Sequence, residues 1–181
     1  LGTMNHSSID VTWVSQSEPT KGIINHNDTS FFFNKISGLF WKITDTHAYP
    51  AIRFSSTSNK VSGNTFDILR PDRSGTRHYM ELLSTSGSDY NYSNVISLRN
   101  CFDSGSMVNN MIEVGVSSYL CQNTKIRDYQ RNSGTLGAGI ADIFLGDANF
   151  TYIEAASGVS SGTKIEIDIN SEPNTIITGA S

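Results

Sequence analysis

Apolar residues recur along the chain at an interval of about 30 positions. One series, spaced by 30 residues throughout, consists of Ile36, Phe66, Ile96 and Ile126. A second series has intervals of 30, 30 and 31 residues and consists of Ile52, Leu82, Ile112 and Ile143. Apolar and polar residues alternate around these positions, which is typical of short strands, and the clearest alternation is Ile165-Glu166-Ile167-Asp168-Ile169. Stretches rich in Ser, Asn, Asp and Gly lie between the strands and predict turns.

An asparagine lies just before each residue of the first series, at Asn34, Asn64, Asn94 and Asn123. Short strands that repeat at a fixed period, with a turn residue at a matching offset, predict a parallel β-helix. In that fold each repeat forms one rung, and inward side chains stack on the next rung at about 4.8 Å. Stacked asparagine amides would bond to one another along such a column. The alternative is an antiparallel β-sandwich or jelly roll, which has many short strands but needs no such repeat.

The repeat also divides the chain. Residues 31–181 carry the period, which shortens after Ile143, and we expect them to form rungs within a fragment of a longer protein. Residues 1–30 carry no clear period, so we expect an entry segment or a cap there.

Composition supports an all-β chain and removes several classes of function. Ser, Thr and Asn make up 58 of the 181 residues, and Ile outnumbers Leu 18 to 9, which favours strands and turns over helices. The net charge of −4 and the scattered Lys and Arg argue against a nucleic-acid partner. No apolar run is long enough to insert into a membrane. We expect Cys101 and Cys121 to be free thiols, and no Cys/His spacing predicts a metal site or a cofactor.

The repeat allows a prediction of which polar residues share a face. If Ile52, Leu82 and Ile112 point inward, then one outward column consists of Arg53, Leu83 and Glu113. By the same reasoning, a second outward column consists of Asp67, Ser97 and Arg127. Groups one or two rungs apart are separated by about 5 to 10 Å, the range over which two carboxyl groups share the work of glycoside hydrolysis.

The candidate catalytic acids are therefore Asp67, Glu113 and Asp103. Arg53 and Arg127 are candidates to bind an anionic sugar or a phosphate. The alternative for every one of these residues is an ordinary solvated position on a strand.

Aromatic residues in polar surroundings suggest a surface on which sugar rings could stack. The best candidates are Tyr90 and Tyr92 in one polar loop, together with Trp41. A role in the core or at a subunit interface is the alternative for these three residues.

Three segments, residues 58–68, 123–128 and 174–179, resemble rungs of the right-handed parallel β-helix of bacteriophage tailspikes and pre-neck appendages, whose architecture is similar to that of pectate lyases. The resemblance covers residues 31–181 and lies in rung pattern and composition, without a diagnostic motif. It implies a homotrimeric protein of the virion tail that binds a host cell-surface polysaccharide or teichoic acid, and it makes hydrolysis of that polymer the candidate reaction. One alternative is a non-catalytic structural or folding-assisting trimerisation segment of the spike, and a lectin-like β-sandwich is another.

Overall fold

The structure, a computed structural model, describes residues 4–15, 24–27, 30–43, 50, 52–56, 61–73, 79–84, 91–103, 106–107, 109–115, 121–132, 134–154, 157–158, 165–168 and 176–178. Within these ranges all regular structure is β-strand and no helix occurs. Accordingly, the described part of the chain holds no helix that could cross a membrane.

Most strands belong to three sheets. The first sheet consists, in spatial order, of β1 (Met4–Asn5), β4 (Phe31–Phe32), β7 (Val61–Ser62), β11 (Asn91–Tyr92), β16 (Cys121–Gln122) and β21 (Ala148–Asn149). The second consists of β3 (Ile24–Asn27), β6 (Ile52–Ser56), β10 (Met80–Ser84), β15 (Ile112–Val114), β20 (Ile143–Leu145) and β24 (Ile165–Ile167).

The third sheet is the largest. It consists of β13 (Phe102–Asp103), β9 (Pro71–Arg73), β5 (Lys35–Ile43), β8 (Thr65–Ile68), β12 (Val95–Leu98), β17 (Lys125–Arg127), β22 (Tyr152–Glu154) and β25 (Ile176–Thr178), with β2 (Ser8–Ser15) also paired to β5. Two further pairs are β14 (Ser106–Met107) with β19 (Thr135–Leu136), and β18 (Gln130–Arg131) with β23 (Ser157–Gly158).

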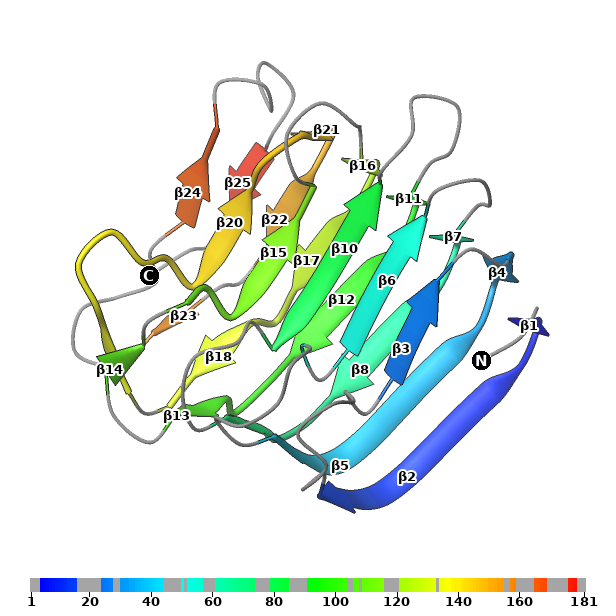
Figure 1. Cartoon of the computed structure of the whole chain (residues 1–181), viewed down its shortest axis with the longest axis horizontal. Coiled ribbons are helices and arrows are strands. Elements are labelled where there is room, and N and C mark those ends of the chain that lie inside the picture. Colours follow the sequence, from blue (N-terminus) through cyan, green and yellow to red (C-terminus); the bar gives the residue numbers. More distant parts are fainter. Residues whose placement is uncertain are drawn as a thin grey trace.

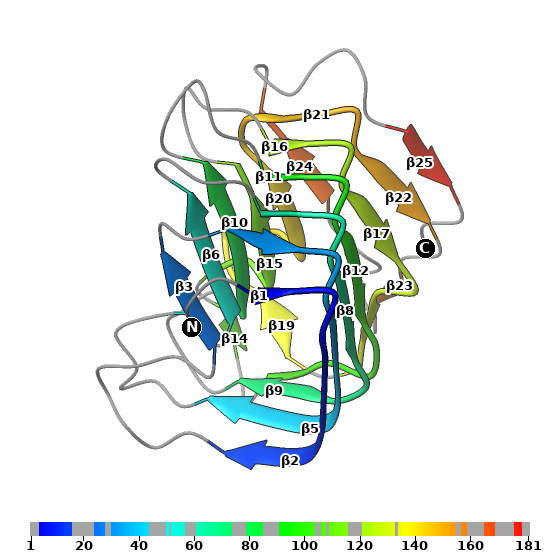
Figure 2. The same cartoon turned by 90° about the vertical axis from the view of Figure 1, so that its right-hand side faces the viewer.

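Every strand pair in the described ranges is parallel, an arrangement that the antiparallel sandwich does not provide. Across the second sheet the strands follow one another in sequence order, and in Figure 1 their colours run from blue at β3 to orange-red at β24. Figure 2, turned by 90°, shows the second and third sheets on opposite sides of the molecule, with the first sheet joining them. Each repeat therefore contributes a strand to each sheet, including β1, β2 and β3 from the segment predicted as an entry or cap.

The first apolar series forms one column, as predicted. Ile36 is the register partner of Phe66, Phe66 of Ile96, and Ile96 of Ile126. All four side chains are fully buried. The column continues to Ile153, which is the partner of Ile126 and is also buried. Chain positions thirty apart thus lie on top of one another in the third sheet.

The prediction for the second apolar series is wrong at one residue, Leu82. Ile52 pairs with Met80, and Met80 with Ile112, whereas Leu82 is the partner of Phe54. The interval in this sheet is therefore 28 residues and then 32, instead of a constant 30. A shift of two residues leaves every side chain on the same face of a strand. Met80 and Leu82 are both buried, so the apolar pattern alone could not distinguish the two registers.

The three sheets share one apolar core. The rings of Phe31, Phe54 and Phe66 come from the first, second and third sheets, respectively, and all three are fully buried. The ring centroids of Phe31 and Phe54 are 4.9 Å apart, and those of Phe54 and Phe66 are 5.2 Å apart. Tilted aromatic pairs at such distances add to the free energy gained from burial.

A ladder of asparagine side chains lines the corner between the first and third sheets. The Oδ1 atom of Asn64 accepts hydrogen bonds from the backbone N–H and the Nδ2 of Asn34, at 2.9 and 3.1 Å. The Oδ1 of Asn94 accepts the same two bonds from Asn64, at 3.1 and 3.0 Å. The prediction of Asn123 as the fourth member is wrong: Thr124 is buried at that position, and Asn123 is the exposed residue before it.

Candidate active site

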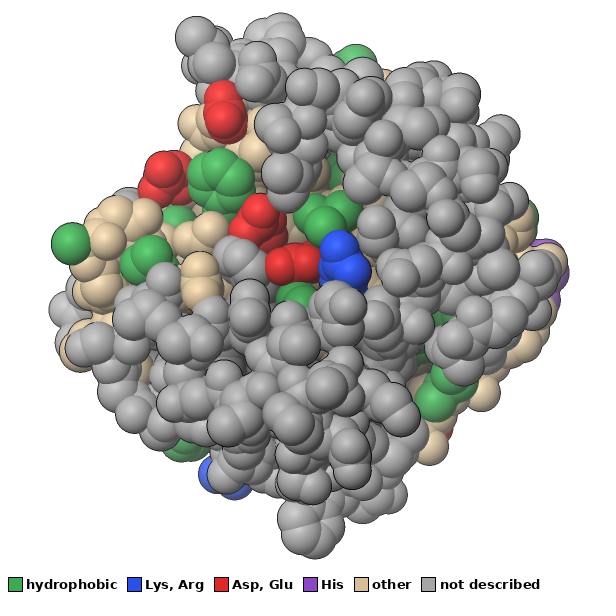
Figure 3. Space-filling view, viewed as in Figure 1, with side chains coloured by type: hydrophobic (Ala, Val, Ile, Leu, Met, Phe, Trp, Pro, Cys, Tyr) green, Lys and Arg blue, Asp and Glu red, His purple; other side chains and the backbone are tan. Residues whose placement is uncertain are grey.

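The outward side of the second sheet carries a column of mostly charged residues. Because residues such as Ile52, Met80 and Ile112 point into the core, the strand alternation turns their successors outward. This column, called here the carboxylate face, consists of Arg53, Glu81, Glu113, Phe144 and Glu166, which are register partners on β6, β10, β15, β20 and β24. In Figure 3, acidic side chains lie beside a basic one near the centre of this face.

Glu81 lies between a cation and a second carboxylate. The Nε of Arg53 is 3.3 Å from the Oε2 of Glu81, and the two side chains are 23% and 14% exposed. On the other side, Glu81 is the register partner of Glu113. Neighbouring strands are separated by about 4.8 Å, so the two glutamates are held one strand apart on the same face.

Among the described strands, the pairing of Glu81 with Glu113 differs from the other pairs of charged residues, which join opposite charges. Five register pairs of the described strands join two charged residues, and four of them have opposite signs: Arg53–Glu81, Lys42–Asp72, Arg73–Asp103 and Arg127–Glu154. The fifth is Glu81–Glu113. Like charges directly opposite each other destabilise a sheet. Glu81 therefore has a cation on one side and a carboxylate on the other.

The strand spacing between the two glutamates is close to the separation of the catalytic carboxyl groups in one class of glycosidase. Retaining glycosidases hold their two carboxyl groups about 5 to 5.5 Å apart, so that one protonates the leaving oxygen and the other attacks the anomeric carbon. Phe144 follows Glu113 in the column and is partly exposed. An aromatic ring at that point can contact the apolar face of a sugar.

Two of the predicted site residues, Arg53 and Glu113, lie on the carboxylate face. The residue between them is Glu81, not Leu83 as predicted, because of the two-residue shift in register. Leu83 is instead the partner of Ser55. The sequence prediction therefore found one of the two adjacent carboxylates and missed the other.

Asp67 lies on a different sheet from Glu113. It is on β8 of the third sheet, where its register partner is Ser97, as predicted. Its Oδ1 is 2.6 Å from the Nη2 of Arg99. Asp67 and Glu113 are therefore not brought together as a catalytic pair.

The other candidates do not gather at one place either. Arg127 is an exposed residue at the end of β17, next to Glu154 in the third sheet. Asp103 lies on β13 opposite Arg73, while Trp41 lies on β5 and Tyr92 on β11, and the side chains of these candidates are outside the described set. Tyr90 lies outside the described residues.

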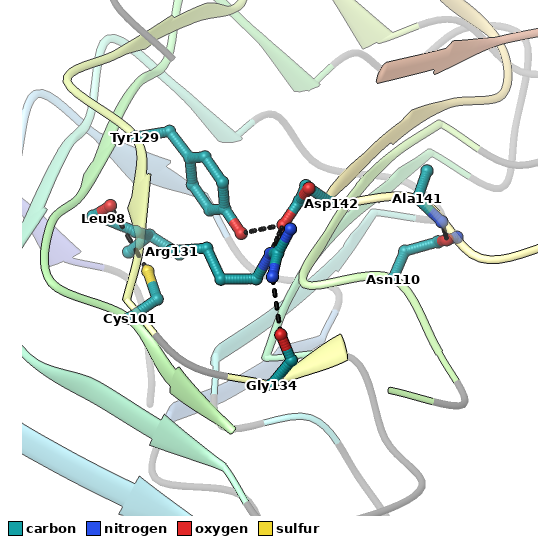
Figure 4. Close-up of polar contacts among 8 residues, drawn as sticks. All are labelled: Leu98, Cys101, Asn110, Tyr129, Arg131, Gly134, Ala141 and Asp142. Carbon is teal, nitrogen blue, oxygen red and sulfur yellow. Dashed lines mark hydrogen bonds and ion pairs between the residues drawn. The ribbon is translucent and has the colours of Figure 1, made fainter. Parts of the chain in front are cut away.

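A buried polar cluster that the sequence analysis missed lies between β18 and β20 (Figure 4). The Nε of Arg131 is 2.7 Å from the Oδ1 of Asp142, and both side chains are 0% exposed. The hydroxyl of Tyr129 donates to the same oxygen at 2.7 Å, and the Nη1 of Arg131 donates to the carbonyl of Gly134 at 2.6 Å. Burial, together with the nearby Cys101 and Asp142, raises the pKa of Tyr129 well above its usual value.

The buried cluster has a structural role. Its side chains have no access to a substrate, and they join the strand that holds Arg131 to the segment that leads into β20. The backbone carbonyl of Asp142 also accepts from the N–H groups of Met111 and Ile112, at 3.1 and 3.0 Å. The sequence near the cluster shows only the glycine-rich residues 134–139, which predict a loop and no ion pair.

Cys101 and Cys121 are both buried free thiols, as predicted. Within the ranges that the structure describes, no three His, Cys, Asp or Glu side chains lie close enough to hold a metal ion. Comparison of the chain with protein-family models, with curated proteins and with solved structures finds no match.

Proposed function

We propose that the chain is a right-handed parallel β-helical segment of a homotrimeric bacteriophage tailspike or appendage, which binds a host cell-surface polysaccharide or teichoic acid and hydrolyses it at Glu81 and Glu113. The observation that carries the reaction is the pairing of these two carboxylates on one outward face. The parallel pairing of successive repeats supports the β-helix. A right-handed path is the strong preference of parallel crossover connections in proteins.

The surroundings of the two glutamates suggest different roles for them. Arg53 lies 3.3 Å from Glu81, so this carboxylate has a cation beside it and is assigned as the nucleophile. Glu113 lies on the side away from Arg53, between Glu81 and Phe144, and serves as the acid and then the base. Glu113 gives a proton to the leaving oxygen while Glu81 bonds to the anomeric carbon. Water, deprotonated by Glu113, then cleaves that bond, and the product keeps its anomeric configuration.

The test is the release of reducing ends from purified bacterial surface polysaccharides, with teichoic acids assayed for binding. Glu81→Gln and Glu113→Gln should each lower the rate by about 10² to 10⁴ while the protein still binds the polymer. Asp67→Asn is the matched control, because Asp67 is an outward strand carboxylate on another sheet, and it should keep the wild-type rate.

Stability provides a second readout. Glu113→Gln should change the free energy of unfolding by no more than about 1 kcal/mol, because the residue is a partly exposed strand position. If a glutamine variant is as stable as the wild type but releases reducing ends more slowly, the loss is in the reaction and not in folding. Equal rates for wild type and both glutamine variants would refute the assignment. A trimer by light scattering that neither binds nor cleaves any polymer would support the alternative, a non-catalytic structural or folding-assisting trimerisation segment.

A further inference from the structure

The corner between the first and third sheets carries a second column that the carboxylate face does not use. At this position each repeat places one residue with positive φ, and the column, called here the corner ledge, consists of His6, Phe33, Gly63, Ser93, Asn123 and Phe150. The φ angles lie between 52° and 66°. Both phenylalanines are largely exposed, Phe33 at 59% and Phe150 at 52%.

Phenylalanine is an unfavourable residue at such a position. The left-handed conformation suits Gly and is tolerated by Asn, but for a bulky side chain it is a strained outlier. An exposed ring also gains little free energy from burial. Gly63, Ser93 and Asn123 show that the same corner forms with small or polar residues. Phe33 and Phe150 are therefore not needed for the fold, and strain of this kind is concentrated at functional sites.

The ring of Phe33 has a defined position. It is stacked on His6, with ring centroids 5.1 Å apart and an angle of 19° between the planes. On the next repeat it lies against Gly63, where an added Cβ would come within 2.5 Å of its Cδ1 atom. The ring is held from both neighbouring repeats while more than half of the side chain stays exposed. A rigid, exposed aromatic surface suits binding, because little freedom is lost when a ligand arrives.

We infer that the corner ledge is a non-catalytic binding site for an uncharged glycan. Its two aromatic ends are four strand spacings apart, about 19 Å, and the residues between them are Gly63 and the exposed Ser93 and Asn123. Rings at both ends match the apolar faces of sugars, and the hydroxyl and amide between them match sugar hydroxyl groups. The ledge holds no Asp, Glu, Lys or Arg, so its chemistry favours a neutral polymer over an anionic one.

A second copy of the chain is a poorer match for the ledge. Protein interfaces need a continuous apolar centre from which water is excluded. Here the two exposed rings are separated by small and polar residues. The inference extends the proposed binding of glycans to a second surface, but its evidence is independent of the carboxylate face.

The experiment is affinity electrophoresis of the full chain in gels that contain dextran, mannan or galactan, with polygalacturonate as the anionic comparison. We expect at least one neutral polymer to retard the protein. Phe33→Asn and Phe150→Asn should each raise the dissociation constant about tenfold, because asparagine keeps the left-handed turn but removes the ring. Their unfolding midpoints should equal or exceed the wild-type value. Asp67→Asn, which changes an outward strand carboxylate outside both the ledge and the carboxylate face, should bind as the wild type does.

Three results would overturn the inference. The first is that no neutral polymer retards the protein. The second is that the double variant Phe33→Asn/Phe150→Asn binds as tightly as the wild type. The third is a change of oligomeric state in the asparagine variants without any change in binding, which would make the ledge a subunit interface. Loss of cleavage in Glu113→Gln bears only on the carboxylate face.

Discussion

Asn64 is the residue whose removal should reveal how much the buried amide ladder contributes to stability. It is fully buried, and its side chain takes part in four hydrogen bonds. Its Oδ1 accepts from the backbone and side chain of Asn34, and its Nδ2 donates to the carbonyl of Phe31 and to the Oδ1 of Asn94. Asn64→Ala removes all four and adds no polar group in their place.

The expected loss follows from these bonds. A typical hydrogen bond contributes about 0.5 to 1.5 kcal/mol net, and a buried group left without a partner costs about 1 to 3 kcal/mol. The backbone N–H of Asn34 and the carbonyl of Phe31 both lose a bond here. Because the penalties of one network are not additive, we expect a total of about 3 to 5 kcal/mol. That is a large share of the stability of a typical domain, about 5 to 15 kcal/mol.

The assay is urea unfolding followed by circular dichroism at neutral pH. Asn5→Ala serves as the control, because Asn5 is exposed in the first sheet, and it should change the free energy of unfolding by less than about 0.5 kcal/mol. A cost of less than about 1 kcal/mol for Asn64→Ala, with an unchanged denaturant slope, would refute the view that the ladder stabilises the stacked repeats.

The same reasoning predicts a gain of stability at the end of the ladder. Thr124 is buried next to Asn94, and its hydroxyl oxygen has no hydrogen-bond partner. An asparagine there could accept from Asn94 as Asn94 accepts from Asn64. Thr124→Asn should therefore raise the free energy of unfolding by about 1 kcal/mol. A decrease would show that the corner at this repeat cannot hold the larger amide.

Two further predictions concern the buried cluster. The pKa of Tyr129 is raised in the folded state, so above about pH 10 this residue ionises in the unfolded chain while it stays neutral in the folded one. The free energy of unfolding should therefore keep its full value below about pH 10 and fall above it, by up to about 1.4 kcal/mol per pH unit. In urea unfolding at pH 9, 10 and 11, the free energy of unfolding should decline less steeply for Tyr129→Phe than for the wild type. Equal slopes for the two proteins would contradict this prediction. Arg131→Met should cost about 3 to 5 kcal/mol, since it leaves Asp142 buried without its cation. The partly exposed pair Arg99–Asp67 provides the comparison. Arg99→Met should cost less than about 1 kcal/mol of the free energy of unfolding. An equal cost for Arg99→Met and Arg131→Met would refute the role of burial.

The sequence predicted the repeat because each inward column must be apolar for the stacked strands to bury it. The column from Ile36 to Ile126 follows from that requirement. The asparagines at 34, 64 and 94 repeat at the same interval, and their amides bond to one another along the corner. The pairing of Glu81 with Glu113 could not be predicted in the same way. A two-residue shift keeps both Met80 and Leu82 in the core, so the apolar pattern is satisfied by either register, while the identity of the outward neighbours changes completely.

The buried ion pair could not be predicted for a different reason. Arg131 and Asp142 are 11 residues apart, much less than one repeat, and they meet because the chain returns after the glycine-rich residues 134–139. Charged residues are rarely buried completely, so a sequence pattern assigns both to the surface. In the folded chain each of the two provides the compensating charge that the other needs.

Register decides which charges become neighbours in stacked parallel strands, and this makes the exception on the second sheet informative. A random arrangement would place like charges together as often as unlike ones. Four of the five charged register pairs in the described strands have opposite signs, which is the favourable arrangement across a strand pair. In the fifth pair, Glu81 has Glu113 on one side and Arg53 on the other, and a shift of two residues would pair Glu113 with Leu83 instead. The register of these strands therefore decides whether two carboxyl groups stand one strand apart, which is the arrangement that the proposed hydrolysis requires.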